Sequence, residues 1–125
     1  MRRDPVGAHH AVVECPFCQI AQGSLRSDKV AETDRVLAFR DINPQAPTHV
    51  LLIPKQHVVS SAAEVDHDHA EMLAELFTLA ARVARSEGLA SGWRLVTNVG
   101  ADAGQSVSHL HFHLLGGRPM RWPPG

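Results

Sequence analysis

Residues 109–115 read His-Leu-His-Phe-His-Leu-Leu, so polar and apolar side chains alternate along this segment. Successive side chains of a β-strand point to opposite faces, and a strand here would place the three imidazoles on one face and Leu110, Phe112 and Leu114 on the other. The bland interpretation is a half-buried strand whose polar face happens to carry histidines. Because histidine titrates near neutrality and ligates metals, the pattern instead favours catalysis or metal binding.

Two kinds of chemistry stay open for this strand. In the first, the histidines hold a catalytic zinc, but the chain has no His-Glu-x-x-His motif, and Asp102 is the only acidic residue of the strand and its preceding loop. In the second, a neutral imidazole is a nucleophile, which needs anion donors and an acceptor that fixes the ring tautomer. Residues 99–106 supply such donors, because their glycines free the backbone amides and Ser106 adds a hydroxyl.

Both cysteines of the chain lie in Cys15-Pro-Phe-Cys18, a spacing shared by metal and redox sites. A tetrahedral zinc site needs two further ligands, for which His57 and His109 are the candidates. Such a site would tie the amino-terminal helix to the sheet, whereas the alternative is a pair of reduced, partly buried thiols. If His109 ligates a metal, its lone pair is occupied, and the other two histidines of the strand remain for chemistry.

Hydrophobic periodicity predicts an α+β domain with an antiparallel sheet, because short strands follow one another in sequence with helices inserted between them. Residues 66–87 form an amphipathic helix whose apolar stripe, Phe77 included, is expected in the core. A shorter helix is predicted at residues 16–22. The predicted strands are residues 29–33, 36–41, 49–54, 93–98 and 109–115.

Length and composition indicate the domain organisation and disfavour several classes of partner. Residues 1–13 lack periodicity and are expected to be a mobile leader, which leaves residues 14–125 as one domain. The net charge of -1 leaves no broad basic surface, so nucleic acid is not an expected partner. No signal peptide and no apolar run near the roughly 20 residues of a membrane helix are apparent. We therefore expect a cytoplasmic protein with no membrane partner.

The sequence closely resembles the histidine-triad (HIT) superfamily, in the Hint branch of histidine-triad nucleotide-binding proteins. The His-x-His-x-His motif followed by two apolar residues is specific for this superfamily. The Trp-Pro-Pro-Gly ending points to the Hint branch and away from the dinucleoside-polyphosphate branch. The matching blocks are CPFCQIAQG, VLAFRDINPQAPTHVLLIPKQH, GWRLVTNVG, AGQSVSHLHFHLLGG and RPMRWPPG, which together span residues 15–125.

This resemblance implies a HIT-like five-stranded antiparallel sheet with one short and one long helix, pairing as a homodimer with a ten-stranded sheet. It implies a purine nucleoside phosphoramidase, a hydrolase that cleaves the P–N bond of adenosine 5'-phosphoramidate and related purine substrates through a nucleotidyl-histidine intermediate. Dinucleoside polyphosphate hydrolysis, or a nucleotide-binding scaffold with incidental activity, are the alternatives. The implied zinc is structural, and the chemical step needs no cofactor.

The resemblance also assigns residues. His111 matches the nucleophile, His113 the phosphate-binding third histidine, and His49 a histidine close to the active site. Either Ser106 or a neighbouring histidine would protonate the leaving group. The implied nucleotide-binding residues are Asp41 at the ribose, Ile42 at the base, and Asn98, Gly104, Gln105, Ser106, His111 and His113 at the phosphate. The implied zinc ligands are Cys15, Cys18, His57 and His109, with His49 as the alternative to His57.

Overall fold

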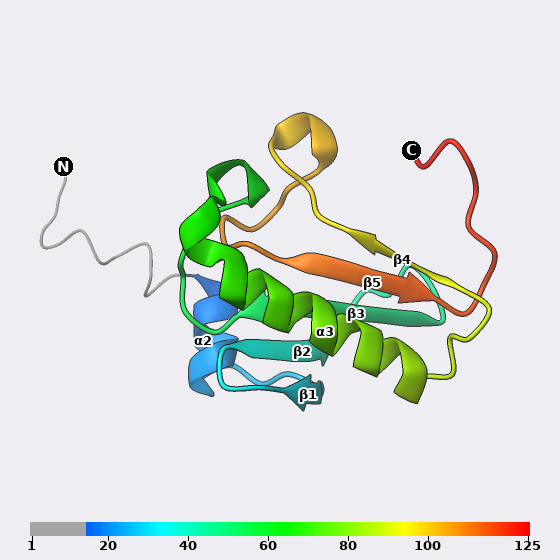
Figure 1. Cartoon of the computed structure of the whole chain (residues 1–125), viewed down its shortest axis with the longest axis horizontal. Helices are drawn as coiled ribbons and strands as arrows, with labels where there is room; N and C mark the ends of the chain where they lie inside the picture. Colours follow the sequence, from blue (N-terminus) through cyan, green and yellow to red (C-terminus); the bar gives the residue numbers. More distant parts are fainter. Residues whose placement is uncertain (1–14) are drawn as a thin grey trace, which may run out of the picture.

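The computed structural model describes residues 15–125, and the leader expected at residues 1–13 lies outside this range. Five strands form one antiparallel sheet in the order β1-β2-β3-β5-β4 (Figure 1). This confirms the predicted α+β fold, with one short and one long helix. The helices are α2 Pro16–Gln22 and α3 Ala70–Ser86, and the strands are β1 Lys29–Glu32, β2 Val36–Arg40, β3 Thr48–Pro54, β4 Trp93–Val96 and β5 Phe112–Gly116. Short 3-10 turns occur at Ala62–Glu64, His67–His69 and Ala101–Ala103.

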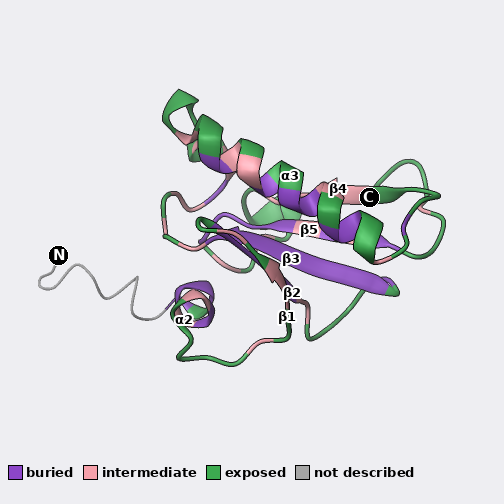
Figure 2. Cartoon of the chain, turned by 60° about the horizontal axis from the view of Figure 1, so that its bottom comes forward, coloured by how far each residue is buried: buried purple, intermediate pink, exposed green. Residues whose placement is uncertain are grey.

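The centre of the sheet is covered on both faces, which explains the uninterrupted apolar run in β3. Figure 2 shows α3 packed on one face, while α2 lies on the opposite side. All seven residues of β3 are buried. Because successive side chains alternate, Val50 and Leu52 pack toward α3, whereas Leu51 and Ile53 pack toward α2.

Helix α2 carries both cysteines to the sheet because of how it begins. Cys15 is its N-cap residue, and the Cys15 Sγ accepts the N–H of Cys18 at 3.4 Å. Pro16 occupies the first turn, where its missing N–H has no intrahelical partner to lose. Gly23 ends the helix with a φ of 84°, a left-handed conformation that glycine adopts without strain.

The histidine strand begins later than predicted. β5 starts at Phe112 and not at residue 109, so His109 and His111 precede the ladder with β3. Pro54, the last residue of β3, has no N–H to extend that ladder, and its carbonyl oxygen lies 2.9 Å from the His109 Nε2. A ring-to-backbone hydrogen bond thus replaces strand pairing at this point.

The predicted alternation of side chains holds even where residues 109–111 are not paired with β3. Leu110, Phe112 and Leu114 all belong to the core under α3. The prediction was wrong for Phe77, which is 52% exposed. Its ring lies at the edge of the α3 stripe and contacts Phe112 edge-on, with ring centroids 5.6 Å apart. Within residues 15–125, no helix is long and apolar enough to cross a membrane.

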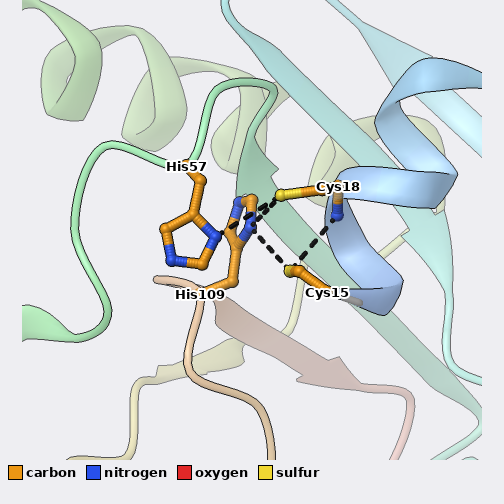
Figure 3. Close-up of side chains that lie close together, drawn as sticks. All are labelled: Cys15, Cys18, His57 and His109. Atoms are coloured by element: carbon orange, nitrogen blue, oxygen red, sulfur yellow. Dashed lines mark hydrogen bonds between the residues drawn. The ribbon is translucent and has the colours of Figure 1, made fainter. Parts of the chain in front are cut away.

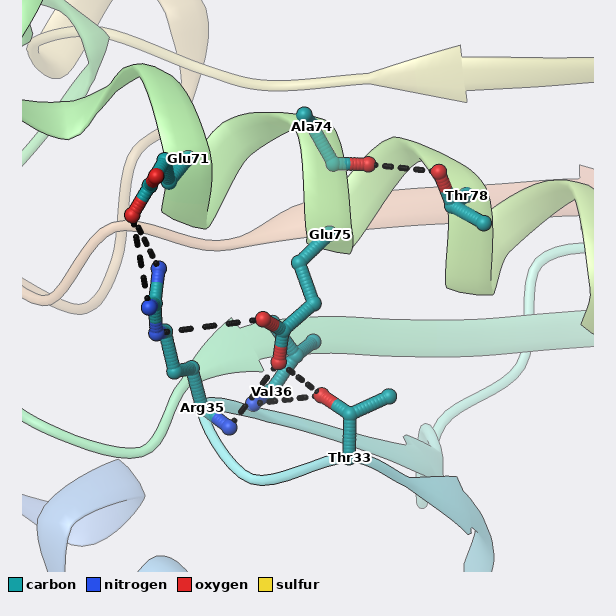
Figure 4. A network of polar contacts seen from close by, with 7 residues as sticks. All are labelled: Thr33, Arg35, Val36, Glu71, Ala74, Glu75 and Thr78. Carbon is teal, nitrogen blue, oxygen red and sulfur yellow. Dashed lines mark hydrogen bonds and ion pairs between the residues drawn. The ribbon is translucent and has the colours of Figure 1, made fainter.

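A polar network joins the β1–β2 turn to α3 (Figure 4). The Glu75 carboxylate accepts hydrogen bonds from the Thr33 hydroxyl and, at 3.0 Å, from the Arg35 N–H. The Thr33 hydroxyl also accepts the N–H of Val36 at 3.1 Å. The hydrogen bond from Thr33, followed by that from Arg35, lowers the pKa of Glu75 below its ordinary value of 4.5. Within residues 15–125, Glu71 pairs only with the Arg35 guanidinium, and its side chain is 85% exposed.

We predict that Glu75→Gln reduces the free energy of unfolding more than Glu71→Gln at pH 7, since exposed ion pairs contribute little. When folding lowers the pKa of a carboxyl, its ionised form stabilises the fold at any pH above the pKa that the group has in the unfolded chain. This stabilisation is lost as the pH falls through the pKa of the folded protein. The difference in free energy of unfolding between Glu75→Gln and the wild type should therefore become smaller below pH 4.5. Urea unfolding at pH 7 and at low pH measures this difference. Equal destabilisation by the two variants at pH 7 would contradict the prediction.

Candidate functional site

Four side chains from separate parts of the chain meet beside α2 (Figure 3). Cys15 and Cys18 come from the start of α2, His57 follows β3, and His109 precedes β5. The His109 Nδ1 lies 3.3 Å from the Cys15 Sγ and 3.5 Å from the Cys18 Sγ, and the His57 Nδ1 lies 3.4 Å from the Cys18 Sγ. The four ligand atoms all lie within 4.8 Å of one another, so this cluster could hold a metal ion.

The protonation of the cluster fits a metal. Because the His109 Nε2 faces the Pro54 carbonyl, the ring proton belongs on Nε2, and Nδ1 presents its lone pair to the sulfurs. Burial lowers the pKa of His109 to about 4, so the ring is neutral at pH 7. Burial, with the neighbouring Cys15, raises the pKa of the Cys18 thiol to about 11. A bound divalent cation would favour the thiolate and so lower the pKa of the Cys18 thiol again. Two sulfurs with two imidazoles form a donor set that zinc accepts.

A second group of titratable side chains lies further along the same face of the sheet. The His49 Nε2 is 2.9 Å from the His113 Nδ1 and 3.4 Å from the Asp41 Oδ2. The backbone N–H of Gln45 donates to the His49 Nδ1 at 3.0 Å, so the His49 ring proton belongs on Nε2. Although the ligand atoms of this group also lie within 4.8 Å of one another, a metal would need the Nε2 position that the proton occupies. The group is better described as a chain of hydrogen-bond donors.

His113 ends this donor chain as a neutral ring. Burial, followed by the neighbouring His111 and His49, lowers the pKa of His113 to about 4. Its Nδ1 accepts from His49, which leaves the proton on Nε2. The His113 Nε2 is therefore a hydrogen-bond donor.

His111 lies between the two groups, with its ring centroid 5.2 Å from that of His113. The His111 Nδ1 is 2.7 Å from the His109 carbonyl oxygen, which can only accept, so Nδ1 carries the proton and Nε2 keeps its lone pair. Phe17 packs edge-on against the ring at a centroid distance of 5.0 Å, and the side chain is only 4% exposed. A buried, oriented imidazole with an unprotonated Nε2 has the arrangement of a nucleophile or a general base.

The glycine-rich loop between β4 and β5 is fixed largely by Gln105. Its side-chain oxygen accepts the N–H of Gly100 at 3.0 Å, and its amide nitrogen donates to the carbonyls of Ser60 and Val107 at 2.9 and 3.0 Å. The Gln105 amide thus holds the loop in shape. Ser106, the next residue, is exposed.

The other residues expected at a nucleotide site come from the turn after β2 and from the segment between β4 and β5. Asp41 follows β2 and accepts the N–H of Asn43 at 2.8 Å, and its neighbour Ile42 is fully exposed. Asn98 is half-buried just after β4. Gly104 ends the 3-10 turn of the loop with a φ of 82°.

A cavity of about 500 Å³ is lined by residues of β4, β5 and the C-terminal tail. Two of its lining residues, Val96 and Leu115, are the register partners of His113 and His49. Because register partners point to the same side of a sheet, this cavity lies on the face that carries the paired rings.

Three residues that shape the site were missed at the sequence level. Gln45 acts through its backbone N–H, which leaves no side-chain signature. The Thr97 hydroxyl donates to the His111 carbonyl at 2.8 Å, and a lone strand threonine is uninformative in sequence. Phe17 contacts both His109 and His111, and the only available signal was its place inside the cysteine motif.

Comparison with known proteins identifies the family of the chain. The HIT domain family matches residues 22–120. The chain is 50% identical over 110 residues to the 14 kDa zinc-binding protein of Zea mays, covering 87% of this chain and 86% of that protein. It is 47% identical to Adenylylsulfatase HINT1 of Arabidopsis thaliana, over 87% of this chain and 75% of that one. A crystal structure of a HIT family hydrolase from Legionella pneumophila, 51% identical, superposes with a TM-score of 0.86 over 90% of this chain and all of that one. The chain therefore belongs to the HIT domain family.

Proposed function

We propose that this chain is a nucleotide hydrolase that cleaves the P–N bond of purine nucleoside 5'-phosphoramidates such as adenosine 5'-phosphoramidate. The observation that carries the proposal is the tautomer of His111, whose Nδ1–H is held by the His109 carbonyl so that Nε2 presents a lone pair. The hydrolases among the structural relatives support the reaction class. The substrate class follows the likeness to the Hint branch.

In the proposed reaction the His111 Nε2 attacks the α-phosphorus, and the bond from phosphorus to the amine nitrogen breaks. The His109 carbonyl stabilises the positive charge that develops on the His111 ring. The His113 Nε2–H would donate to a nonbridging oxygen as negative charge builds there. The departing amine takes a proton from the Ser106 hydroxyl or from a neighbouring histidine. Water then attacks the phosphorus and displaces His111, which releases the nucleotide. The proton that the water loses returns to the group that protonated the amine.

Recognition of the nucleotide is proposed for the residues around these rings. Asp41 would bind the ribose hydroxyls, and the fully exposed Ile42 would offer an apolar surface to the base. Asn98 and the residues of the glycine-rich loop, Gly104, Gln105 and Ser106, would surround the phosphate. Because Gln105 already uses its side chain to hold the loop, we expect it to act by shaping that loop.

We further propose that Cys15, Cys18, His57 and His109 hold a structural zinc ion. A bound zinc would cross-link α2 to the segments that follow β3 and precede β5. The zinc-binding relative from Zea mays supports the identity of the metal. The chemical step uses His111 and His113, which lie outside this cluster.

Homodimerisation and a cytoplasmic location stay predictions. β4 forms one edge of the sheet, and its first residue, Trp93, is 41% exposed, which is consistent with pairing to a second copy. Phe77 on α3 is a further exposed aromatic side chain.

The proposed substrate is tested by comparing kcat/KM for adenosine 5'-phosphoramidate, diadenosine tetraphosphate and adenylyl sulfate. We expect the phosphoramidate to be preferred by at least about tenfold. A preference for the tetraphosphate would support the dinucleoside polyphosphate alternative, and one for adenylyl sulfate would match the relative from Arabidopsis thaliana. Single-turnover labelling by the phosphoramidate should give an acid-labile adduct, whereas a pure binding module forms none.

We predict that His111→Asn lowers turnover by about a thousandfold or more while AMP binding persists, because the variant loses the attacking nitrogen and keeps a side chain of similar bulk. The matched control is His67→Asn, since His67 is exposed on a 3-10 turn. Steady-state kinetics and AMP titration measure the two effects. Wild-type turnover in purified His111→Asn would refute the assignment.

Purified protein should contain about one zinc ion per chain, because the cluster supplies the four ligands of a closed tetrahedral site. Chelation, or the double variant Cys15→Ser with Cys18→Ser, should remove the metal and reduce the free energy of unfolding by about 3 kcal/mol or more. Elemental analysis and chemical denaturation measure these quantities. His49→Gln is the control for the second histidine group and should retain the zinc. Zinc that persisted in the cysteine variant would contradict the proposed ligand set.

A further inference from the structure

The C-terminal tail and the loop before β3 lie side by side because of the β3–β5 register. Thr48, the first residue of β3, pairs with Gly116, the last residue of β5. The chain that leaves β5 therefore meets the chain that enters β3. Gly117 sits so close to Pro47 that a Cβ added to the glycine would meet the Pro47 Cβ at 2.8 Å.

Arg118 joins the tail to this loop by hydrogen bonds. Its Nη2 donates to the Gln45 carbonyl oxygen at 3.0 Å, and its Nη1 donates to the Pro119 carbonyl oxygen at 3.2 Å. Nη1 also lies 3.4 Å from the Met120 Sδ. All three of these partners are neutral, so within residues 15–125 the guanidinium acts as a donor and not as a member of an ion pair. A hydrogen bond from a charged donor to a carbonyl is stronger than one between neutral groups.

Gln45, whose carbonyl oxygen accepts from Arg118, contacts the histidines through its backbone N–H. The Gln45 N–H donates to the His49 Nδ1 at 3.0 Å, and the His49 Nε2 lies 2.9 Å from the His113 Nδ1. Contacts therefore run without a break from Arg118 through Gln45 and His49 to His113. The contact from Gln45 fixes which ring nitrogen of His49 carries a proton, and the contact from His49 does the same for His113.

We propose that Arg118 is a positioning residue of the active site, which holds the Gln45 backbone so that His49 keeps the tautomer that donates to His113. Its role is exerted at a distance, because Arg118 touches Gln45 and not the histidines. If the loop moved, the His49 Nδ1 would lose its donor, and both neutral tautomers of His49 would become populated. His113 would then lose the donor that keeps its own proton on Nε2, the nitrogen that faces the phosphate in the proposed reaction. The catalytic consequence of this inference rests on the proposed function, whereas the tautomer consequence does not.

The test compares Arg118→Met, which removes the donors and keeps much of the side-chain length, with the conservative Arg118→Lys. Arg121→Met is the matched control, because the tail contact of Arg121 is made by its carbonyl oxygen, which accepts from Arg94 at 3.0 Å. Full-length, metal-loaded protein labelled with ¹⁵N-histidine reports the tautomers of His49 and His113 in long-range ¹H–¹⁵N spectra. The same samples give kcat and KM for adenosine 5'-phosphoramidate.

We expect Arg118→Met to shift His49 and His113 toward mixed tautomers and to lower kcat about fivefold, as befits one hydrogen bond, with little change in KM. Arg118→Lys should keep most of the wild-type tautomer populations and most of the wild-type kcat. Arg121→Met should match the wild type in both measurements. Unchanged His49 resonances in Arg118→Met would overturn the proposal, as would altered resonances with an unchanged kcat.

Gly117→Ala provides a second perturbation of the same contact with Arg118 intact. Its Cβ would meet Pro47 and the backbone φ of 93° is strained for alanine, so the same tautomer change is expected. If the wild type turned over no nucleotide substrate, the proposed function would fail. The tautomer comparison would still decide whether Arg118 sets the His49 ring.

Discussion

Each imidazole of the histidine segment is held in one tautomer by a fixed partner, and the chemistry open to each ring depends on that partner. The His109 Nε2–H donates to the Pro54 carbonyl, so the other nitrogen faces the cysteines. The His111 Nδ1–H donates to the His109 carbonyl, so in the neutral ring Nε2 keeps its lone pair. His49 donates to the Nδ1 of His113, so Nε2 becomes a donor. Three residues of one type thus present three different groups: His109 turns a ring nitrogen to two sulfurs, His111 holds its Nδ1–H on a carbonyl, and His113 offers Nε2 as a donor.

Residue His109 links the metal cluster to the proposed nucleophile. Its ring faces Cys15 and Cys18, while its backbone carbonyl orients His111. Phe17, from the helix that carries both cysteines, packs edge-on against both rings. A displacement of α2 would therefore disturb the rings of His109 and His111 together. A metal bound at the cluster would by this coupling influence the orientation of His111 without contacting it.

The β3–β5 pairing has a similar role on the other side of the site. It sets His49 diagonally across from His113 and brings the C-terminal tail to the loop that precedes β3. Because Thr48 and Gly116 are partners, residues far apart in the sequence meet through the backbone ladder, and the Arg118 side chain adds one further contact between them. Backbone groups then do much of the positioning, since a loop held at both ends presents its amides in fixed directions.

The sequence alone determined the fold class, the two faces of the last strand and the pair of cysteines at the start of a short helix. These features repeat with the period of a strand or helix, or follow from local capping, so nearby residues suffice to predict them. The grouping of Cys15 and Cys18 with His57 depends on where β3 ends. The tautomers depend on contacts with Pro54 and Gln45. Backbone carbonyls and amides are the same at every residue, so sequence carries no mark of which will face a ring, and only tertiary packing decides it.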